Sequence, residues 1–189
     1  MQAIAREARM APLLAAATIR QAHGVVNRDL ILLVLRDELF LCWYTARMHF
    51  TIHTDGGSRG NPGPAGSGAM IRDHLGNAVA SVSQFLGIRT NNYAEYEAVI
   101  LAFEMLAKHV GEKRVGATDV EVKMDSELIV KQMKGVYKVK HPTMKAQFAR
   151  VMKAKEAFKE VSFTHVPRAQ NADADALANE AMDRGSNPK

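Results

Sequence analysis

The fold is decided by residues 53–66, which read HTDGGSRGNPGPAG. Phe50, Ile52 and Thr54 alternate with other residues just before Asp55, and this period of two predicts a half-buried strand that ends at the acid. Glycine and proline dominate the residues that follow, and glycine lets a backbone adopt positive φ and approach another molecule closely. Two interpretations stay open: a plain hairpin loop between two strands, or an acid at a strand end beside a binding loop.

The composition is that of an ordinary globular domain with a core of useful size. The chain has 189 residues, of which 47% are apolar and 24% are charged. A single cysteine, Cys42, excludes a disulfide framework and a cysteine-based zinc site, and it is typical of a cytoplasmic protein. No apolar run reaches the roughly 18 residues that a membrane-spanning helix needs, so we expect no membrane partner. The net charge of +5 weakly favours a polyanionic partner, and we expect a monomer.

Residues 1–47 differ from the rest of the chain, because they carry six arginines and no lysine. Ala3–Gln21 is predicted to be helical with an interruption at Pro12, and the apolar run within Asp29–Tyr44 fits either a buried helix or a strand. Three interpretations stay open: an added helical element, a targeting peptide, or a segment outside the native protein with translation starting at Met48.

The sequence therefore predicts an N-terminal extension at 1–47, one domain at 48–185 and a disordered tail at 186–189. Within the domain, periodicity predicts strands at Met48–Thr54, Gly66–Arg72, Ala78–Leu86, Asp119–Met124 and Val161–Val166, and helices at Thr90–His109, Ser126–Lys134, Pro142–Lys159 and Asn171–Asp183. This order predicts an α/β fold with three antiparallel strands in a meander, followed by crossover units.

Four acids fall at strand ends or in the first turns of predicted helices: Asp55, Glu95, Asp125 and Asp175. Each one alone is explained as a helix cap or a partner of the helix dipole. If the first and fourth strands are parallel neighbours, however, all four meet at one edge of the sheet. Clustered carboxylates repel each other, and a hard divalent cation such as Mg²⁺ or Mn²⁺ removes the conflict. Two such ions about 4 Å apart can activate water and stabilise the leaving oxygen of a phosphodiester.

The segment from Met48 to about Asp183 resembles type 1 ribonuclease H. The resemblance rests on four motifs in order, namely TDGGSRGNPG at 54–63, TNNYAE at 90–95, MDS at 124–126, and HVPR at 165–168 with Asn171 and Asp175. It implies a five-stranded mixed sheet flanked by helices. It also implies metal-dependent hydrolysis of the RNA strand of RNA–DNA hybrids, which leaves 5′-phosphate and 3′-hydroxyl ends. The short segment Lys134–Lys145 is similar to that of compact members without a basic protrusion.

The same resemblance assigns roles to individual residues. Asp55, Glu95, Asp125 and Asp175 look like the catalytic ligands of two Mg²⁺ or Mn²⁺ ions, whereas Asp173 is interpreted as a dipole partner. The resemblance also implies that Gly57, Asn61 and Asn91 contact the RNA strand and that Thr90 and Asn92 contact the DNA strand, while Ser58, Arg168 and Asn171 are also expected at the substrate. Separately from the resemblance, Lys134 and Lys138 belong to a basic cluster that fits either a contact to the DNA strand or a solvated face.

Two alternatives concern residues of these motifs. Asn91 and Asn92 can instead be the cap that opens a helix at Tyr93. No histidine follows His165 in the loop where some relatives carry one, so His165 is interpreted as structural and Arg168 is expected to take part of that role.

Two other functions compete with hybrid cleavage. A hybrid-binding module without catalysis needs the loop and the lysines but not four clustered acids. A nuclease of the same fold that also cuts double-stranded RNA is compatible with the paired asparagines, because these serve to recognise the 2′-hydroxyl.

Overall fold

The computed structural model describes residues 33–35, 38–40 and 48–186, and the chain divides into two units, Met1–Ala46 and Arg47–Lys189. In the first unit, β1 (Leu33–Leu35) pairs antiparallel with β2 (Glu38–Phe40), so this part of the apolar run is strand rather than helix. The predicted helix at Ala3–Gln21 and residues 187–189 lie outside the described residues.

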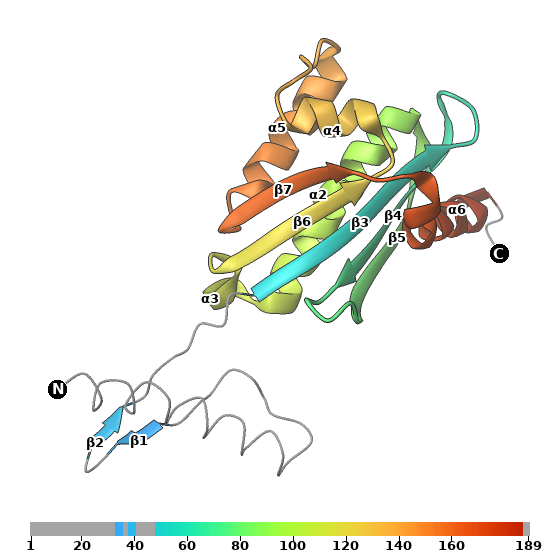
Figure 1. Cartoon of the computed structure of the whole chain (residues 1–189). Helices are drawn as coiled ribbons and strands as arrows, with labels where there is room; N and C mark the ends of the chain where they lie inside the picture. Colours follow the sequence, from blue (N-terminus) through green and yellow to red (C-terminus); the bar gives the residue numbers. More distant parts are fainter. Residues whose placement is uncertain (1–32, 36–37, 41–47, 187–189) are drawn as a thin grey trace. The chain divides into compact units, whose positions relative to one another are not determined.

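The second unit contains a five-stranded sheet in the order β5-β4-β3-β6-β7 (Figure 1). The strands are β3 (Met48–Ser58), β4 (Gly63–Arg72), β5 (Ala78–Arg89), β6 (Thr118–Met124) and β7 (Glu160–His165). β3, β4 and β5 form an antiparallel meander, while β6 pairs parallel with β3 and β7 pairs parallel with β6. The predicted fold class is confirmed.

The helices are α2 (Asn91–Val110), α3 (Glu112–Val115), α4 (Glu127–Met133), α5 (Pro142–Lys155) and α6 (Ala172–Ser186), with a 3-10 turn η1 (Arg168–Gln170). The single turns α3 and η1 were not predicted, because they are too short to show a period. Several predicted ends were also wrong. β4 begins at Gly63, β5 ends at Arg89, and α6 continues to Ser186, the first residue of the predicted tail. β3 continues past Asp55 to Ser58, because the glycine-rich residues themselves pair with β4, and α5 ends at Lys155 instead of Lys159.

Glycines bring a helix against each face of the sheet. A Cβ atom on Gly56 would lie 2.2 Å from the carbonyl carbon of Ala94 in α2, and one on Gly68 would lie 2.3 Å from the carbonyl oxygen of Ala174 in α6. Because neither site has room for a side chain, both helices approach the backbone beside Asp55. β4 is covered on both faces, so it is buried along most of its length.

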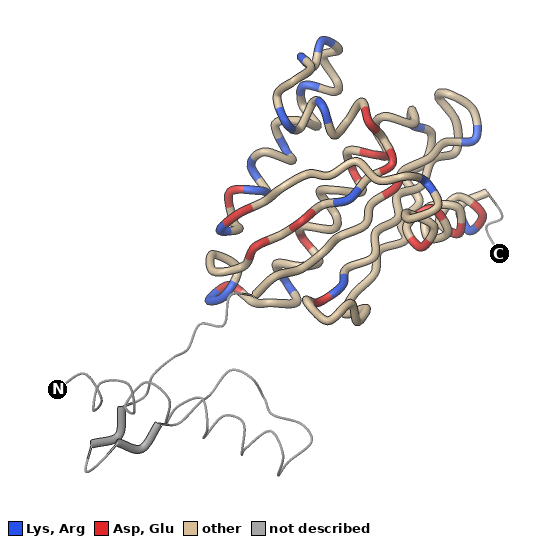
Figure 2. The backbone as a smooth tube through the Cα atoms, in the orientation of Figure 1, with Lys and Arg blue, Asp and Glu red and all other residues tan. Residues whose placement is uncertain are grey.

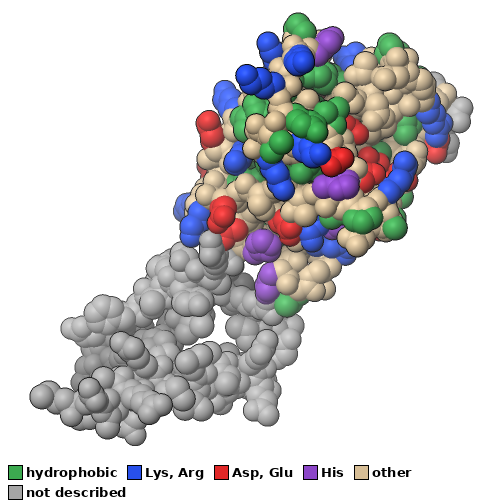
Figure 3. Space-filling view, turned by 45° about the horizontal axis from the view of Figure 1, so that its top comes forward, with side chains coloured by type: hydrophobic (Ala, Val, Ile, Leu, Met, Phe, Trp, Pro, Cys, Tyr) green, Lys and Arg blue, Asp and Glu red, His purple; other side chains and the backbone are tan. Residues whose placement is uncertain are grey.

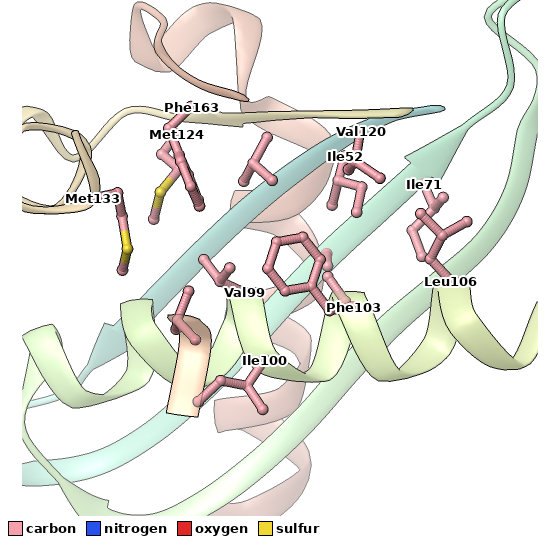
Figure 4. Close-up of a cluster of buried hydrophobic side chains, with 14 of the residues drawn as sticks. Ile52, Ile71, Val99, Ile100, Phe103, Leu106, Val120, Met124, Met133 and Phe163 are labelled. Atoms are coloured by element: carbon pink, nitrogen blue, oxygen red, sulfur yellow. The ribbon is translucent and has the colours of Figure 1, made fainter. Parts of the chain in front are cut away.

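The main core fills the space between the sheet and α2. Val99, Phe103 and Leu106 of α2 point toward Ile52 of β3 and Ile71 of β4 (Figure 4). α5 packs against α2 and contributes Val151 to the same core. None of the helices in the part of the chain that the structure describes is long and apolar enough to cross a membrane.

A buried polar contact fastens α5 to α2. The Glu97 carboxylate accepts hydrogen bonds from Gln147 Nε2 at 2.6 Å and from Arg150 at 2.6 and 3.0 Å. α5 therefore stabilises the helix that carries Glu95.

Candidate active site

The parallel pairing of β3 with β6 places two of the predicted acids side by side. The last residue pair in the register is Thr54 with Met124, so Asp55 and Asp125 are the next residue on each strand. Both acids lie at the carboxyl end of β6, the edge of an α/β sheet where binding sites form. The sequence had predicted this arrangement on the condition that the two strands are parallel neighbours.

α2 brings Glu95 to the same edge. The helix begins at Asn91, and its N-cap is Thr90, whose Oγ1 accepts a hydrogen bond from the Tyr93 main-chain N–H at 3.3 Å. The prediction that Glu95 lies in the first turn was wrong, because the helix starts early enough to put this residue in the second turn. The cap role suggested for Asn91 and Asn92 was wrong for the same reason.

Two neutral donors hold the Glu95 carboxylate. Ser126 Oγ donates a hydrogen bond to Oε2 at 3.0 Å, and Asn91 Nδ2 donates to Oε1 at 3.2 Å. Ser126 is the N-cap residue of α4, but its hydroxyl makes no cap hydrogen bond there. Its side chain therefore serves the acidic site and not the helix end.

Asp175 lies in the first turn of α6, as predicted. The Arg168 guanidinium forms an ion pair with its carboxylate, and Asn179 Nδ2 donates to the same carboxylate at 3.0 Å. Asp173 is turned away from this group and pairs with Arg72 at 2.6 Å. The geometry thus agrees with the choice of Asp175 over Asp173.

All four acids line one pocket of about 300 Å³. Gly57, Ser58, Asn91 and Arg168 line it too, as do Arg59, Asn179 and Met182, which the sequence did not single out. Asn179 was detectable, because it lies four residues after Asp175 on the same helix face. Arg59 contacts Asp183 of α6, a pairing across the chain that no local pattern reveals.

The pocket makes ionisation of two of its acids unfavourable. Burial, together with the charges of Asp125 and Asp175, raises the pKa of Asp55 to about 6. The pKa of Glu95 is raised to about 7 as the net result of burial and the charge of Asp55, which raise it, and the hydrogen bond from Ser126, which lowers it. A cation bound among these groups would remove both effects.

The donor set suits a hard divalent cation, because every candidate ligand is a carboxylate oxygen. In the described residues, however, no three histidine, cysteine or acidic side chains form a ready-made ion site. Glu95 and Asp175 are each held by the protein partners described above.

The glycine-rich loop and α2 are joined directly beside the pocket. Asn61 Oδ1 accepts a hydrogen bond from the Asn91 main-chain N–H at 3.2 Å, while Asn92 is exposed at the start of the helix. The loop is a tight hairpin, closed by a 2.8 Å hydrogen bond from the Arg59 N–H to the Pro64 carbonyl. Both interpretations of the opening motif therefore hold: it is a hairpin, and it lies beside the acidic site.

Lysine and arginine residues are frequent along α5 and between α4 and α5 (Figure 2), and Figure 3 shows basic side chains on the surface of the domain. Lys134 and Lys138 are exposed there, in the segment 134–141 that contains no helix. Lys131 is different, because it pairs with Glu127 at 2.8 Å and lies 5.1 Å from the centre of the Tyr137 ring. Lys134 and Lys138 are thus available to an anionic partner.

Two residues differ from their predicted surroundings. Asn171 was expected at the substrate, but it is fully buried and donates to the Asp125 carboxylate at 3.0 Å, so it does not face a ligand. His165 was expected inside its strand, but it is the exposed last residue of β7, and its Nε2 lies 3.2 Å from the Asp125 main-chain oxygen.

Comparisons with known proteins match this chain to ribonuclease H and related enzymes. The family model described as "Reverse transcriptase-like" matches residues 53–181. A ribonuclease HI of Halobacterium salinarum is 43% identical over 129 residues, which are 68% of this chain and 62% of that protein. The solved structure of LC11-RNase H1, in complex with an RNA/DNA hybrid, has 51% identity and a TM-score of 0.70, and the match covers 73% of this chain and 99% of that one.

A bifunctional protein of Mycobacterium tuberculosis is 44% identical over 138 residues, which are 72% of this chain. The chain spans only 36% of the length of that relative.

Proposed function

Since the chain belongs to the type 1 ribonuclease H family, we propose that it is an endonuclease that hydrolyses the RNA strand of RNA–DNA hybrids and leaves 5′-phosphate and 3′-hydroxyl ends. The observation that carries the proposal is the meeting of Asp55, Glu95, Asp125 and Asp175 in one pocket beside the glycine-rich hairpin. A module that only bound nucleic acid would have no use for four carboxylates that repel its ligand.

The four acids would hold two Mg²⁺ or Mn²⁺ ions, which supply an activated water and charge stabilisation of the leaving oxygen when bound. Asp55 and Asp125 come from adjacent strands in a fixed register, so their main chains are rigid. Ser126 and Asn91 would orient the Glu95 carboxylate through their hydrogen bonds. Arg168, which now pairs with Asp175, would release that carboxylate and bind a substrate phosphate in its place.

The hybrid would lie over the hairpin and the start of α2. We assign Gly57, Ser58, Asn61 and Asn91 to the RNA strand, where backbone and amide groups can bond the 2′-hydroxyl. On the DNA side we assign Thr90, Asn92, Lys134 and Lys138. The LC11 structure, which contains an RNA/DNA hybrid, supports this class of ligand. We further propose a monomer in the cytoplasm, in keeping with the single cysteine.

The test is cleavage of three end-labelled substrates: RNA–DNA hybrid, double-stranded RNA and double-stranded DNA, each with Mg²⁺, Mn²⁺ or EDTA. Metal-dependent cutting of the hybrid's RNA strand alone is the expected result. Cutting of double-stranded RNA as well would favour the broader nuclease, and intact hybrid binding without any cutting would favour the binding module.

Matched substitutions locate the site within the same assay. Asp55→Asn and Asp175→Asn should abolish cleavage while hybrid binding survives. Asp173→Asn is the control, because this acid is two residues from Asp175 but points to Arg72. Full activity in Asp55→Asn would exclude the assignment of the acidic pocket.

A further inference from the structure

Asn171 lies where three of the acid-bearing elements meet. It follows η1 and directly precedes α6, and its side chain has no exposed surface. Its Nδ2 donates hydrogen bonds to the Thr54 carbonyl oxygen at 2.9 Å and to Asp125 Oδ1 at 3.0 Å. Its own carbonyl accepts the main-chain N–H of Asp175 at 3.1 Å. One residue therefore bonds to the residue before Asp55, to the Asp125 side chain and to the Asp175 main chain.

The two amide hydrogens of Asn171 have different uses. The bond to the Thr54 carbonyl ties Asn171 to the main chain of β3, which is held in place by the sheet. The bond to Asp125 then fixes the rotation of that carboxylate relative to β3. Because an amide carries no charge, it orients the carboxylate without competing with a cation for it, unlike the guanidinium on Asp175.

The helix start by itself does not explain an amide at this position. Serine starts a helix as well as asparagine does, and it has no amide. Both hydrogen bonds of Asn171 Nδ2 go to the acidic site, one to the main chain before Asp55 and one to the Asp125 carboxylate. The amide is therefore placed to act on the acids and not on the helix end.

We propose that Asn171 is a positioning residue, which sets the Asp125 carboxylate against β3 and so preorganises the cation site. The inference rests on the proposed function, since it concerns the same pocket. It replaces the substrate contact that the sequence suggested for Asn171, because a side chain with no exposed surface cannot reach a bound hybrid.

The experiment compares three variants of the full chain. Asn171→Ala removes the amide, and Asn171→Ser removes it but keeps a good helix cap. Gln147→Ala is the matched control, because Gln147 is also a buried amide that donates to a carboxylate, but it lies in the contact between α2 and α5. The readouts are Mn²⁺ affinity by calorimetry without substrate, kcat and KM for the hybrid, and urea unfolding in EDTA.

Both Asn171 variants should bind Mn²⁺ about 10- to 100-fold more weakly and lose kcat to a similar extent, as residues that orient metal ligands do. KM for the hybrid should stay within about twofold of the wild type. Gln147→Ala should lower the urea midpoint but keep Mn²⁺ affinity and kcat.

Several outcomes would overturn the inference. Unchanged Mn²⁺ affinity and kcat in both Asn171 variants would do so. A rise in KM alone would mean a substrate contact, and normal values in Asn171→Ser would mean that the amide is not needed to position Asp125. Equal losses in Gln147→Ala would mean general destabilisation. A wild-type chain that neither binds Mn²⁺ nor cuts the hybrid would overturn the proposed function first, and the positioning role with it.

Discussion

Replacing Asp55 with asparagine should stabilise the metal-free protein while it destroys activity. The carboxylate is mostly buried, and its pKa is raised from 3.8 to about 6. One pKa unit corresponds to about 1.4 kcal/mol, so the ionised group makes folding less favourable by about 3 kcal/mol at neutral pH. Asparagine has nearly the same shape and no charge, and it therefore removes this cost.

The stabilisation should depend on pH with a defined sign. An acid with a raised folded-state pKa binds its proton more tightly when folded, so the wild-type protein loses stability as the pH rises from 3.8 to about 6. The gain from Asp55→Asn should be about 3 kcal/mol at pH 8, about half of that at pH 5, and near zero below the unfolded-state pKa.

Urea unfolding in EDTA at pH 8, 5 and 4 measures this gain. The control is Asp173→Asn, an exposed acid paired with Arg72, which should lower stability by less than about 1 kcal/mol at every pH above 5. Equal or lower stability of Asp55→Asn at pH 8 would refute the reasoning, because the carboxylate would then not be held in an unfavourable environment.

Three further perturbations test other parts of the structure. Glu97→Ala should lower the free energy of unfolding by about 1–2 kcal/mol in urea, because it leaves the buried Gln147 amide without its acceptor while Arg150 is half exposed, and an unchanged free energy would contradict this role. Gly56→Ala should cost about 3 kcal/mol and weaken Mn²⁺ binding, since its Cβ would lie 2.2 Å from Ala94 and push α2 away. Lys138→Ala should reduce the slope of log hybrid affinity against log salt by about one unit, whereas Lys113→Ala, at the far end of the sheet, should leave the slope unchanged.

The sequence predicted the sheet and the acid cluster because both follow from local patterns. The alternation around Phe50 and Ile52 defines the buried face of β3, and that face does lie against α2. The position of Asp125 after the apolar β6 then depends on one condition, a parallel neighbour, which the fold meets. Predictions from such patterns agree with the structure because each pattern depends on residues that are close together in the chain.

The helix start and the burial of Asn171 depended on information that the sequence does not carry locally. Thr90, Asn91 and Asn92 are all good cap residues, so sequence alone cannot choose between them. The choice of Thr90 frees Asn91 to reach Glu95, one turn further along the same helix face. Asn171 was predicted at the substrate, but it is fully buried and bonds to Thr54 of β3 and to Asp125, which are distant in the sequence. Both outcomes are decided by packing between distant segments.

The cost of the acidic pocket is itself an argument about function. Burial works against the charged forms of Asp55 and Glu95, and the hydrogen bonds from Ser126 and Asn91 oppose this only in part for Glu95. A fold selected for stability alone would place neutral residues at these positions, as the Asp55→Asn experiment is designed to show. Proteins place destabilising charges in a pocket where the pocket has to bind a ligand. Among common ligands, a divalent cation is the one that is attracted by several carboxylates that otherwise repel each other. The instability of the empty pocket and the affinity of the filled one would then have the same physical cause, so a substitution that relieves the first should abolish the second.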